Sequence, residues 1–277
     1  MRFGLAFAFV SIALVSTTAL LVDPVDAVSQ DMLRNVDLDS PQMSTSEMTR
    51  AEVEALLKAA PQDPAGKRSA DLEGKRLSHL DLSGLDFSGS NLRLVRLNRT
   101  NLKGARFDRA ILNQAWLIDA DLTGASLAKA SLLGTQMQRA KLGGADLNGA
   151  RITADLSGAS LIGARLAGAD LSADMRNQSM GLMRGVLKSA DLRNADLSGA
   201  NLSRANLEFA KLQNANLANC NLSRADLTGA DLSNANLAGA DFTGTDLASA
   251  ILPSADALAD ARNLDKARNL NLVQRPR

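Results

Sequence analysis

An apolar residue, usually leucine, recurs at every fifth position over most of the chain. The series begins at Leu72 and continues to Ile152, then resumes at Leu187 and continues to Leu252. A small residue, usually alanine, comes two positions before each central residue, and Asp or Asn typically stands between them. A period of five fits neither the 3.6-residue period of a helix nor the two-residue alternation of a strand. The pattern predicts a solenoid in which each repeat supplies two inward residues, the small one and the central one.

These units resemble the pentapeptide repeat family, whose pattern A-(D/N)-L-x-x appears in stretches such as ADLSGANLSRANLEF. The resemblance covers roughly residues 70–252. It implies an all-β solenoid, a right-handed quadrilateral β-helix with four repeats per coil, so that residues twenty apart stack. Gly124 and Asn214 illustrate the last position of the repeat, where residues suited to sharp turns are common. At one coil per four repeats, the region predicts about nine coils.

The composition agrees with a narrow interior. Aromatic residues make up 3% of the chain and tyrosine is absent, as expected where little beyond Leu, Phe or Met fits beside a column of alanines. Cys220 occupies a small-residue position, so we interpret it as a buried hydrophobic residue rather than a reactive thiol. Because it is the one cysteine, it cannot form an internal disulfide.

Residues 1–27 have the features of an export signal. Arg2 gives a positive start, an apolar stretch runs from Phe3 to about Val22, and Val25-Asp26-Ala27 offers a cleavage site with small residues. We therefore expect a cleaved signal peptide and a periplasmic protein. The alternative is a chain that stays anchored in the membrane by an uncleaved N-terminal segment.

The segments on either side of the repeats are expected to differ from them. Residues 28–48 are polar and aperiodic, which predicts a flexible leader. In residues 49–69, Thr49 and Glu52 fit a capping box that begins a short helix, and Pro61 ends it. For residues 253–277 we expect a C-terminal cap and tail, with a helix from Ser254 to about Arg262. Helices at one or both ends would cover the bare core of the solenoid.

Two irregularities interrupt the repeat. The spacing from Ile152 to Leu156 is one residue short, and residues 172–186 carry no clean repeat before the original phase returns. This irregular segment is either a tolerated defect or a functional loop. Its methionines could bind Cu(I) through their thioethers, although filling gaps is the more ordinary role of such residues. The candidate loop residues are Met175, Arg176, Asn177, Met180, Met183 and Arg184.

Charge is nearly balanced over the whole chain, at +1, but it is uneven along it. Residues 91–190 are basic and residues 191–252 are acidic on balance. Most charges are expected to form a solvated surface of ladders in which neighbouring coils pair. A basic run next to an outward tryptophan, with Ile111 and Ile118 also outward, is a candidate contact patch. The residues of this candidate binding patch are Arg93, Arg96, Arg99, Lys103, Arg106 and Trp116.

No catalytic constellation is apparent in the sequence. The one histidine, His79, is at an outward position without ligand partners nearby, so neither a metal site nor a triad can be built around it. We expect no enzyme activity and no cofactor. The expected partner is an unknown protein or an anionic component of the cell envelope, a homodimer is left open, and membrane contact is expected only if the N-terminal segment is uncleaved.

The family suggests an alternative function. Some pentapeptide repeat proteins imitate duplex DNA and bind type II topoisomerases, which requires a cytoplasmic protein with a strongly acidic face. The export signal and the balanced charge of this chain argue against that role, and we expect no binding to nucleic acid.

Overall fold

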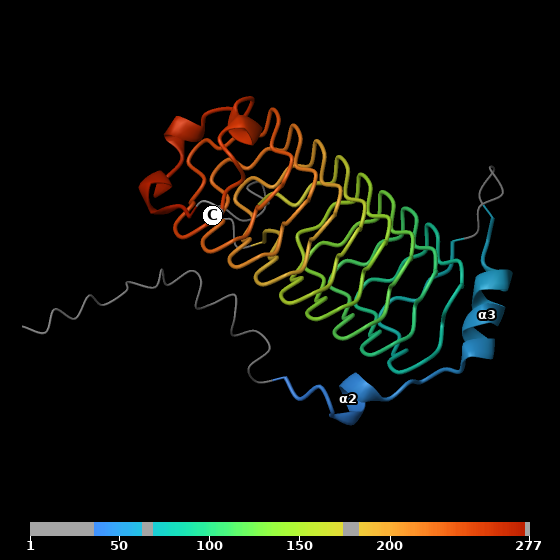
Figure 1. Ribbon diagram of the computed structural model, residues 1–277. Coiled ribbons are helices and arrows are strands. Elements are labelled where there is room, and N and C mark those ends of the chain that lie inside the picture. Colours follow the sequence, from blue (N-terminus) through green and yellow to red (C-terminus); the bar gives the residue numbers. More distant parts are fainter. Residues whose placement is uncertain (1–35, 63–68, 174–182, 275–277) are drawn as a thin grey trace, which may run out of the picture. The chain divides into compact units, whose positions relative to one another are not determined.

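The computed structural model describes residues 36–62, 69–173 and 183–274. From Asp71 onward the chain winds into stacked coils with four sides (Figure 1). Each repeat forms a single parallel bridge to the repeat one coil further on; for example, Asp71 pairs with Asn91 and Asn91 with Ile111. Across the described residues these isolated bridges take the place of longer strands. The predicted four-sided β-solenoid is confirmed.

Each side of the solenoid is a ladder of paired residues, which we number in chain order. The first side runs from Asp71 to Arg262, the second from Arg76 to Arg268, the third from Asp81 to Gln274 and the fourth from Asp86 to Asn236. The corner between the first and second sides is called the first corner.

Where an Asp or Asn precedes the central leucine, its side chain can stabilise the turn that follows. Asp81 accepts the backbone N–H of Ser83 through Oδ1 at 3.0 Å, and Asp196 accepts that of Ser198 in the same way at 3.0 Å. Such an Asx turn satisfies a backbone donor that would otherwise face solvent at the corner. The preference for Asp or Asn is therefore a backbone requirement.

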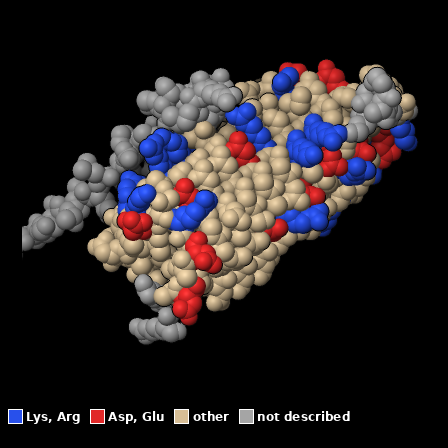
Figure 2. All heavy atoms as spheres, turned by 90° about the horizontal axis from the view of Figure 1, so that it is seen from above, with Lys and Arg blue, Asp and Glu red and all other residues tan. Residues whose placement is uncertain are grey.

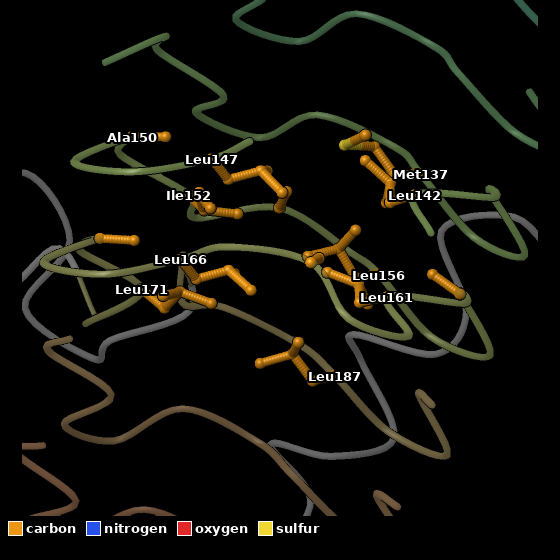
Figure 3. Packing of buried hydrophobic residues seen from close by; sticks show 14 of the residues in the cluster. Met137, Leu142, Leu147, Ala150, Ile152, Leu156, Leu161, Leu166, Leu171 and Leu187 are labelled. Atoms are coloured by element: carbon orange, nitrogen blue, oxygen red, sulfur yellow. The ribbon is translucent and has the colours of Figure 1, made fainter. Parts of the chain in front are cut away.

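The interior is a continuous column of apolar side chains. Nearly all central leucines and preceding alanines are fully buried, and Figure 3 shows Leu147, Ile152, Leu166 and Leu171 side by side in successive coils. Cys220 is buried as predicted, and its thiol donates to the Leu197 carbonyl at 2.8 Å. Burial raises the pKa of this thiol to about 12, so it stays protonated and unreactive.

The two irregularities lie at the same corner, in adjacent coils. The short repeat lacks its turn residue, between Thr153 and Ala154. The extra residues of the irregular segment lie between Ser172 and Gly185. At both places the chain passes from the first to the second side. Consequently Gln136 pairs with Asp155 at a spacing of nineteen residues, and Asp155 pairs with Val186 at thirty-one. Both interruptions of the repeat thus lie at the first corner.

The described residues before the repeats include two helices. Residues 50–59 form helix α3 (Arg50–Ala59), whose capping box between Thr49 and Glu52 is present as predicted. Val53 is fully buried in the same cluster as the leucines, and Met48 and Leu57 pack against that cluster.

The predicted flexible leader is wrong for its described part. Helix α2 (Pro41–Ser44) places Met43 in a buried position, and Arg99 binds Asp39 at 2.7 Å. The backbone N–H of Glu47 donates to the Arg76 carbonyl at 2.9 Å. Polar sequence without periodicity predicts no fixed structure, but these residues are held both by bonds within the segment, such as that from the Met43 N–H to the Ser40 carbonyl at 2.9 Å, and by the second side of the solenoid.

The predicted C-terminal α-helix is also wrong. Residues 253–274 contain three short 3₁₀ turns, η1 (Asp256–Leu258), η2 (Leu264–Lys266) and η3 (Leu270–Leu272). Between them the chain rejoins the ladders, because Arg262, Arg268 and Gln274 pair with the preceding coil. The solenoid therefore continues past the predicted boundary at residue 252, with its last repeats lengthened to six residues.

Candidate binding surfaces at the first corner

The six residues of the predicted binding patch do not form one surface. Arg93 follows the ladder of the first side, Arg96 and Trp116 are on the second, Lys103 is on the third and Arg106 on the fourth. The physical reason is the repeat itself: five residues carry the chain from one side to the next, so neighbours in sequence face different directions. The basic run encircles a coil, and the single contiguous patch inferred from sequence is wrong.

Three of these basic side chains are paired with acids. Arg99 binds Asp39 at 2.7 Å, and Lys103 Nζ lies 3.4 Å from Asp121. Arg106 lies between two acids, at 3.1 Å from Asp108 and 3.7 Å from Asp86.

These pairs favour the charged forms of their members. The hydrogen bond to Asp108 and the nearby Asp86 raise the pKa of Arg106. Burial opposes ionisation of Asp121, but hydrogen bonds from Thr123 and the charge of Lys103 hold the pKa of Asp121 below its usual value. These charges therefore belong to the solvated ladders expected over most of the surface.

Figure 2 shows how charge is distributed over one face of the solenoid. Lys and Arg side chains lie close to Asp and Glu, and uncharged residues separate the groups. Pairs one coil apart, such as Arg139 with Asp119 at 2.7 Å and Arg165 with Asp146 at 2.6 Å, give the same picture in atomic terms. Exposed pairs of this kind each contribute well under about 1 kcal/mol.

Part of the predicted patch does come together at the first corner. Arg96 and Trp116 are bridged neighbours on the second side, and Arg93 lies just before the same corner. Between the two arginines Leu94 occupies the turn position with φ of 57° and a side chain that is 46% exposed. We call Arg93, Leu94, Arg96 and Trp116 the N-terminal corner patch.

Sequence reasoning missed Leu94, although its signal was present. The turn position otherwise favours Gly and Asn because its backbone is left-handed, as at Gly74 and Gly134 of the same column. A bulky apolar residue there is costly in the folded chain and is left facing solvent. An exposed leucine at a position of the repeat that disfavours it is a reason to suspect a contact surface.

Ile118 was expected to face outward in the same patch, but it is buried, with 1% of its surface exposed. Its backbone N–H donates to Asn98 Oδ1 at 3.1 Å, and Asn98 Nδ2 donates to the Met43 carbonyl at 3.3 Å. The second side at Asn98 is thus contacted by the chain's own α2 segment. Leu94, at the first corner, remains exposed.

A groove of about 1090 Å³ lies between α3 and the fourth side. Its walls include Leu57 and Leu85 together with acidic and basic side chains in equal number. The charged residues that line it are Glu54, Lys58, Asp86, Arg106, Arg109, Asp108, Lys129 and Asp146. This balance gives the groove no preference for a ligand of either charge.

The described residues contain no cluster of three or more His, Cys, Asp or Glu side chains suited to a metal ion. His79 is exposed and sits at a turn position with φ of 63°. Of the candidate loop, Met175, Arg176, Asn177 and Met180 lie outside the described residues. Met183 is described, and its methyl group lies over the turn glycine Gly134.

Within the same described ranges, no helix is both long and apolar enough to cross a bilayer.

Known proteins resemble the chain in its repeats. A family model described as pentapeptide repeats matches residues 68–99, 76–114, 115–153, 154–173, 186–224 and 220–256. No curated protein sequence matches the chain.

Three solved structures illustrate the likeness. HetL, a pentapeptide repeat protein involved in heterocyst differentiation regulation from the cyanobacterium Nostoc sp. strain PCC 7120, is 30% identical; the match covers 82% of this chain and 99% of HetL, with a TM-score of 0.32. QnrB1, a plasmid-mediated fluoroquinolone resistance protein, is 24% identical over 67% of this chain and 83% of its own, with a TM-score of 0.33. A pentapeptide repeat protein of the Arabidopsis thaliana thylakoid lumen is 24% identical over 64% and 76%, with a TM-score of 0.19. The chain belongs to the pentapeptide repeat family, whose members fold as right-handed quadrilateral β-helices.

Proposed function

We propose that the protein is an exported, non-catalytic binding or scaffold protein of the bacterial cell envelope. Its solenoid would present a fixed outer surface to a protein or to an anionic component of the envelope. Helix α3 would serve as the cap of the N-terminal end, since Val53 is buried in the core cluster. About nine coils of regular repeats would supply the length of the surface.

The main support is the way the acidic side chains are used. In an enzyme they would be the candidate acids and bases, but here they hold backbone turns or pair with basic side chains. Asp191 shows both roles, because it accepts the backbone N–H of Arg193 at 3.3 Å and binds its guanidinium at 2.7 Å. These bonds lower the pKa of Asp191 and raise that of Arg193. Acids kept ionised by structural bonds are poorly suited to proton transfer near neutral pH.

The proposed contact surface is the N-terminal corner patch. Leu94 is its exposed apolar centre, Arg93 and Arg96 flank it, and Trp116 lies next to Arg96 in the ladder. An apolar centre with a basic rim fits a partner that brings an apolar side chain and acidic neighbours.

The proposed location rests on residues 1–27. A basic residue, an apolar stretch and a small residue at Ala27 are the features that an export signal requires. The alternative is that the same segment remains as a membrane anchor.

Cell fractionation tests the location. The full chain with a C-terminal tag should be recovered from the periplasm with Val28 as its first residue by mass spectrometry. Leu14→Arg, which interrupts the apolar stretch, should leave the uncleaved chain in the cytoplasm, and Leu14→Val is the matched control. Recovery of wild type from the cytoplasm at full length would refute export, and recovery of the full-length chain from membranes would favour the anchored alternative.

Crosslinking in an envelope fraction tests the binding surface. Leu94→Asn keeps a residue that tolerates the left-handed turn and removes the apolar centre, so folding should be unaffected and crosslinked species should be lost. Gln114→Asn, at the next turn of the same column, is the control: it introduces asparagine at the same backbone position without removing an apolar side chain. Equal yields from the two variants and wild type would refute this surface.

Topoisomerase mimicry is not favoured by the surface of the described residues. Along the ladder of the third side, Asp121 is followed by Lys141, Ser160, Asp191 and Lys211. Lysines thus interrupt the acids, and this side lacks the continuous negative charge of a DNA mimic.

A further inference from the structure

Beyond the irregular segment, the first corner carries a column of basic side chains. Arg184, Arg204 and Arg224 each come two residues before a ladder residue of the second side, and these ladder residues pair in turn. Gly244 and Lys266 continue the column, since the Gly244 N–H donates to the Lys266 carbonyl at 3.0 Å. Arg184 makes contacts of its own, and the inference therefore rests on the arginines that follow it.

Two arginines of this column border one hollow in the surface together with Arg268 of the second-side ladder. Arg204, Arg224 and Arg268 surround a space of about 380 Å³ whose fourth lining residue is Gly244. A Cβ at Gly244 would lie 3.5 Å from Arg224 Cγ, so the glycine leaves room beside the arginine stem. The hollow thus presents guanidinium groups around a gap without a side chain.

Of the three arginines around this hollow, one is paired with an acid. Arg268 lies 3.2 Å from Asp246, which also accepts from Asn269 at 2.7 Å. Among the described residues, neither Arg204 nor Arg224 has an ion-pair partner. Asp226, the ladder residue next to Arg224, binds the backbone N–H of Thr228 instead.

This arrangement differs from the opposite-charge pairs found at several other places on the surface. One coil apart, Arg139 faces Asp119 and Lys188 faces Glu208, because opposite charges in adjacent ladder positions attract and like charges repel. Arg204 and Arg224 stack like on like, and both hold the left-handed backbone, at φ of 61° and 58°. Arg109 and Lys129 stack in the same way at another corner, but there as many acids as bases line the neighbouring groove. In the described part of the chain no acid lines the hollow beside Arg204 and Arg224, so the electrostatic and steric costs at these two positions indicate a function.

We propose that the hollow between Arg204, Arg224 and Arg268 binds a phosphate group. Guanidinium forks match the oxygens of an oxyanion, and a tetrahedral phosphate has enough oxygens to accept from three arginines, whereas a carboxylate has two. The phosphate could be free in solution or part of a lipid headgroup. The inference rests on the proposed binding function and assigns it a second site, separate from the N-terminal corner patch.

The test uses a double variant that keeps the turns. Arg204→Asn with Arg224→Asn removes both unpaired charges and introduces the residue that other corners use at this backbone conformation. The matched control is Arg109→Asn with Lys129→Asn, which removes the same charge from two stacked turn positions at another corner, where φ is 59° and 58°. Thermal unfolding in chloride alone should show that both variants fold.

Two ligands distinguish the two sources. Inorganic phosphate is titrated by calorimetry at constant ionic strength, and flotation compares phosphatidylglycerol vesicles with phosphatidylcholine vesicles. Wild type and the control should bind one or both phosphate ligands saturably, and the Arg204/Arg224 variant should bind roughly tenfold more weakly or worse. Binding of inorganic phosphate identifies a site for the free ion, and binding of phosphatidylglycerol vesicles alone identifies a headgroup site.

No saturable binding to either ligand, or an equal loss in both double variants, would overturn the phosphate site. Neither result would affect export or crosslinking through Leu94, so a failure here remains separate from a failure of the proposed function.

Discussion

The two ends of the solenoid differ in what packs against the last coil. At the N-terminal end a segment outside the repeat does so, with Val53 of α3 fully buried and Met48 and Leu57 against the core. At the C-terminal end the repeat itself continues, and its last leucines, Leu264 and Leu270, are only half-buried.

The difference separates two needs of a solenoid end. A helix satisfies its own backbone, so it can bury apolar side chains against the coil without extending the ladders. The lengthened repeats do the reverse: Arg268 and Gln274 satisfy the backbone of the preceding coil, while the leucines between them keep part of their surface in water. Because each coil contacts only its neighbours, changes at one end should be felt mainly there.

The largest effect is expected from placing a charge at the helix end. Val53→Asp would bury a carboxylate without a partner and should cost about 3 kcal/mol or more in unfolding free energy. Leu272→Asp, at a residue 54% exposed near the other end, should change stability by less than about 0.5 kcal/mol. Urea unfolding followed by the fluorescence of Trp116, the one tryptophan, measures both.

Hydrogen exchange provides the control for location. Val53→Asp should increase exchange in the first coils and leave the coil around Leu237 protected. If protection were lost uniformly over the whole chain, a change at one end would not stay local, and the two ends could not be treated as independent.

A smaller effect is expected at the lengthened repeats. Leu264→Ala removes a half-buried side chain, and the lost transfer free energy is about 1 kcal/mol. Faster exchange should appear in the last coil, at the N–H groups of Phe242 and Leu247, which donate to Arg262 and Arg268. If Leu264→Ala lowered the unfolding free energy as much as Val53→Asp does, Leu264 would have to be as deeply buried as Val53, which would contradict the structure.

How much of this was predictable varies with the kind of signal. The column of leucines and the capping box were readable because each depends on residues close in sequence. The C-terminal repeats were missed because they keep the pattern but change its period: Ala261-Arg262-Asn263-Leu264 recurs six residues later as Ala267-Arg268-Asn269-Leu270. A search for a period of five does not detect these repeats, and Ser254 as an N-cap residue then suggests a helix instead.

The surfaces were less predictable than the core. A run of arginines looks like a patch in sequence, but four sides distribute it around a coil, and only residues twenty apart or next to one corner meet. Leu94 and Arg204 stand out only once the turn position is known to be left-handed. The covering of Asn98 by the α2 segment had no sequence signal, since it depends on contacts between distant residues.

The capping box gives a smaller effect at the helix end. Thr49→Ala removes the hydroxyl that accepts the Glu52 N–H at 3.3 Å and should cost about 1 kcal/mol. Thr49→Ser keeps the hydroxyl and is the matched control. Urea unfolding of the three proteins should place the serine variant close to wild type, and an alanine variant as stable as wild type would show that α3 is held by packing alone.

The smallest effect is expected from pH, again at this end. The Thr49 backbone N–H, and then its hydroxyl, lower the pKa of Glu52 in the folded chain. A depressed folded pKa means that the contribution of Glu52 is fully present above its unfolded value of about 4.3 and is lost as pH falls through the folded value. The difference in urea midpoint between wild type and Glu52→Gln should therefore be constant from neutral pH to about 5 and shrink below about 4. A difference for Glu52→Gln that persists undiminished at low pH would mean that the glutamate acts by packing rather than by its charge.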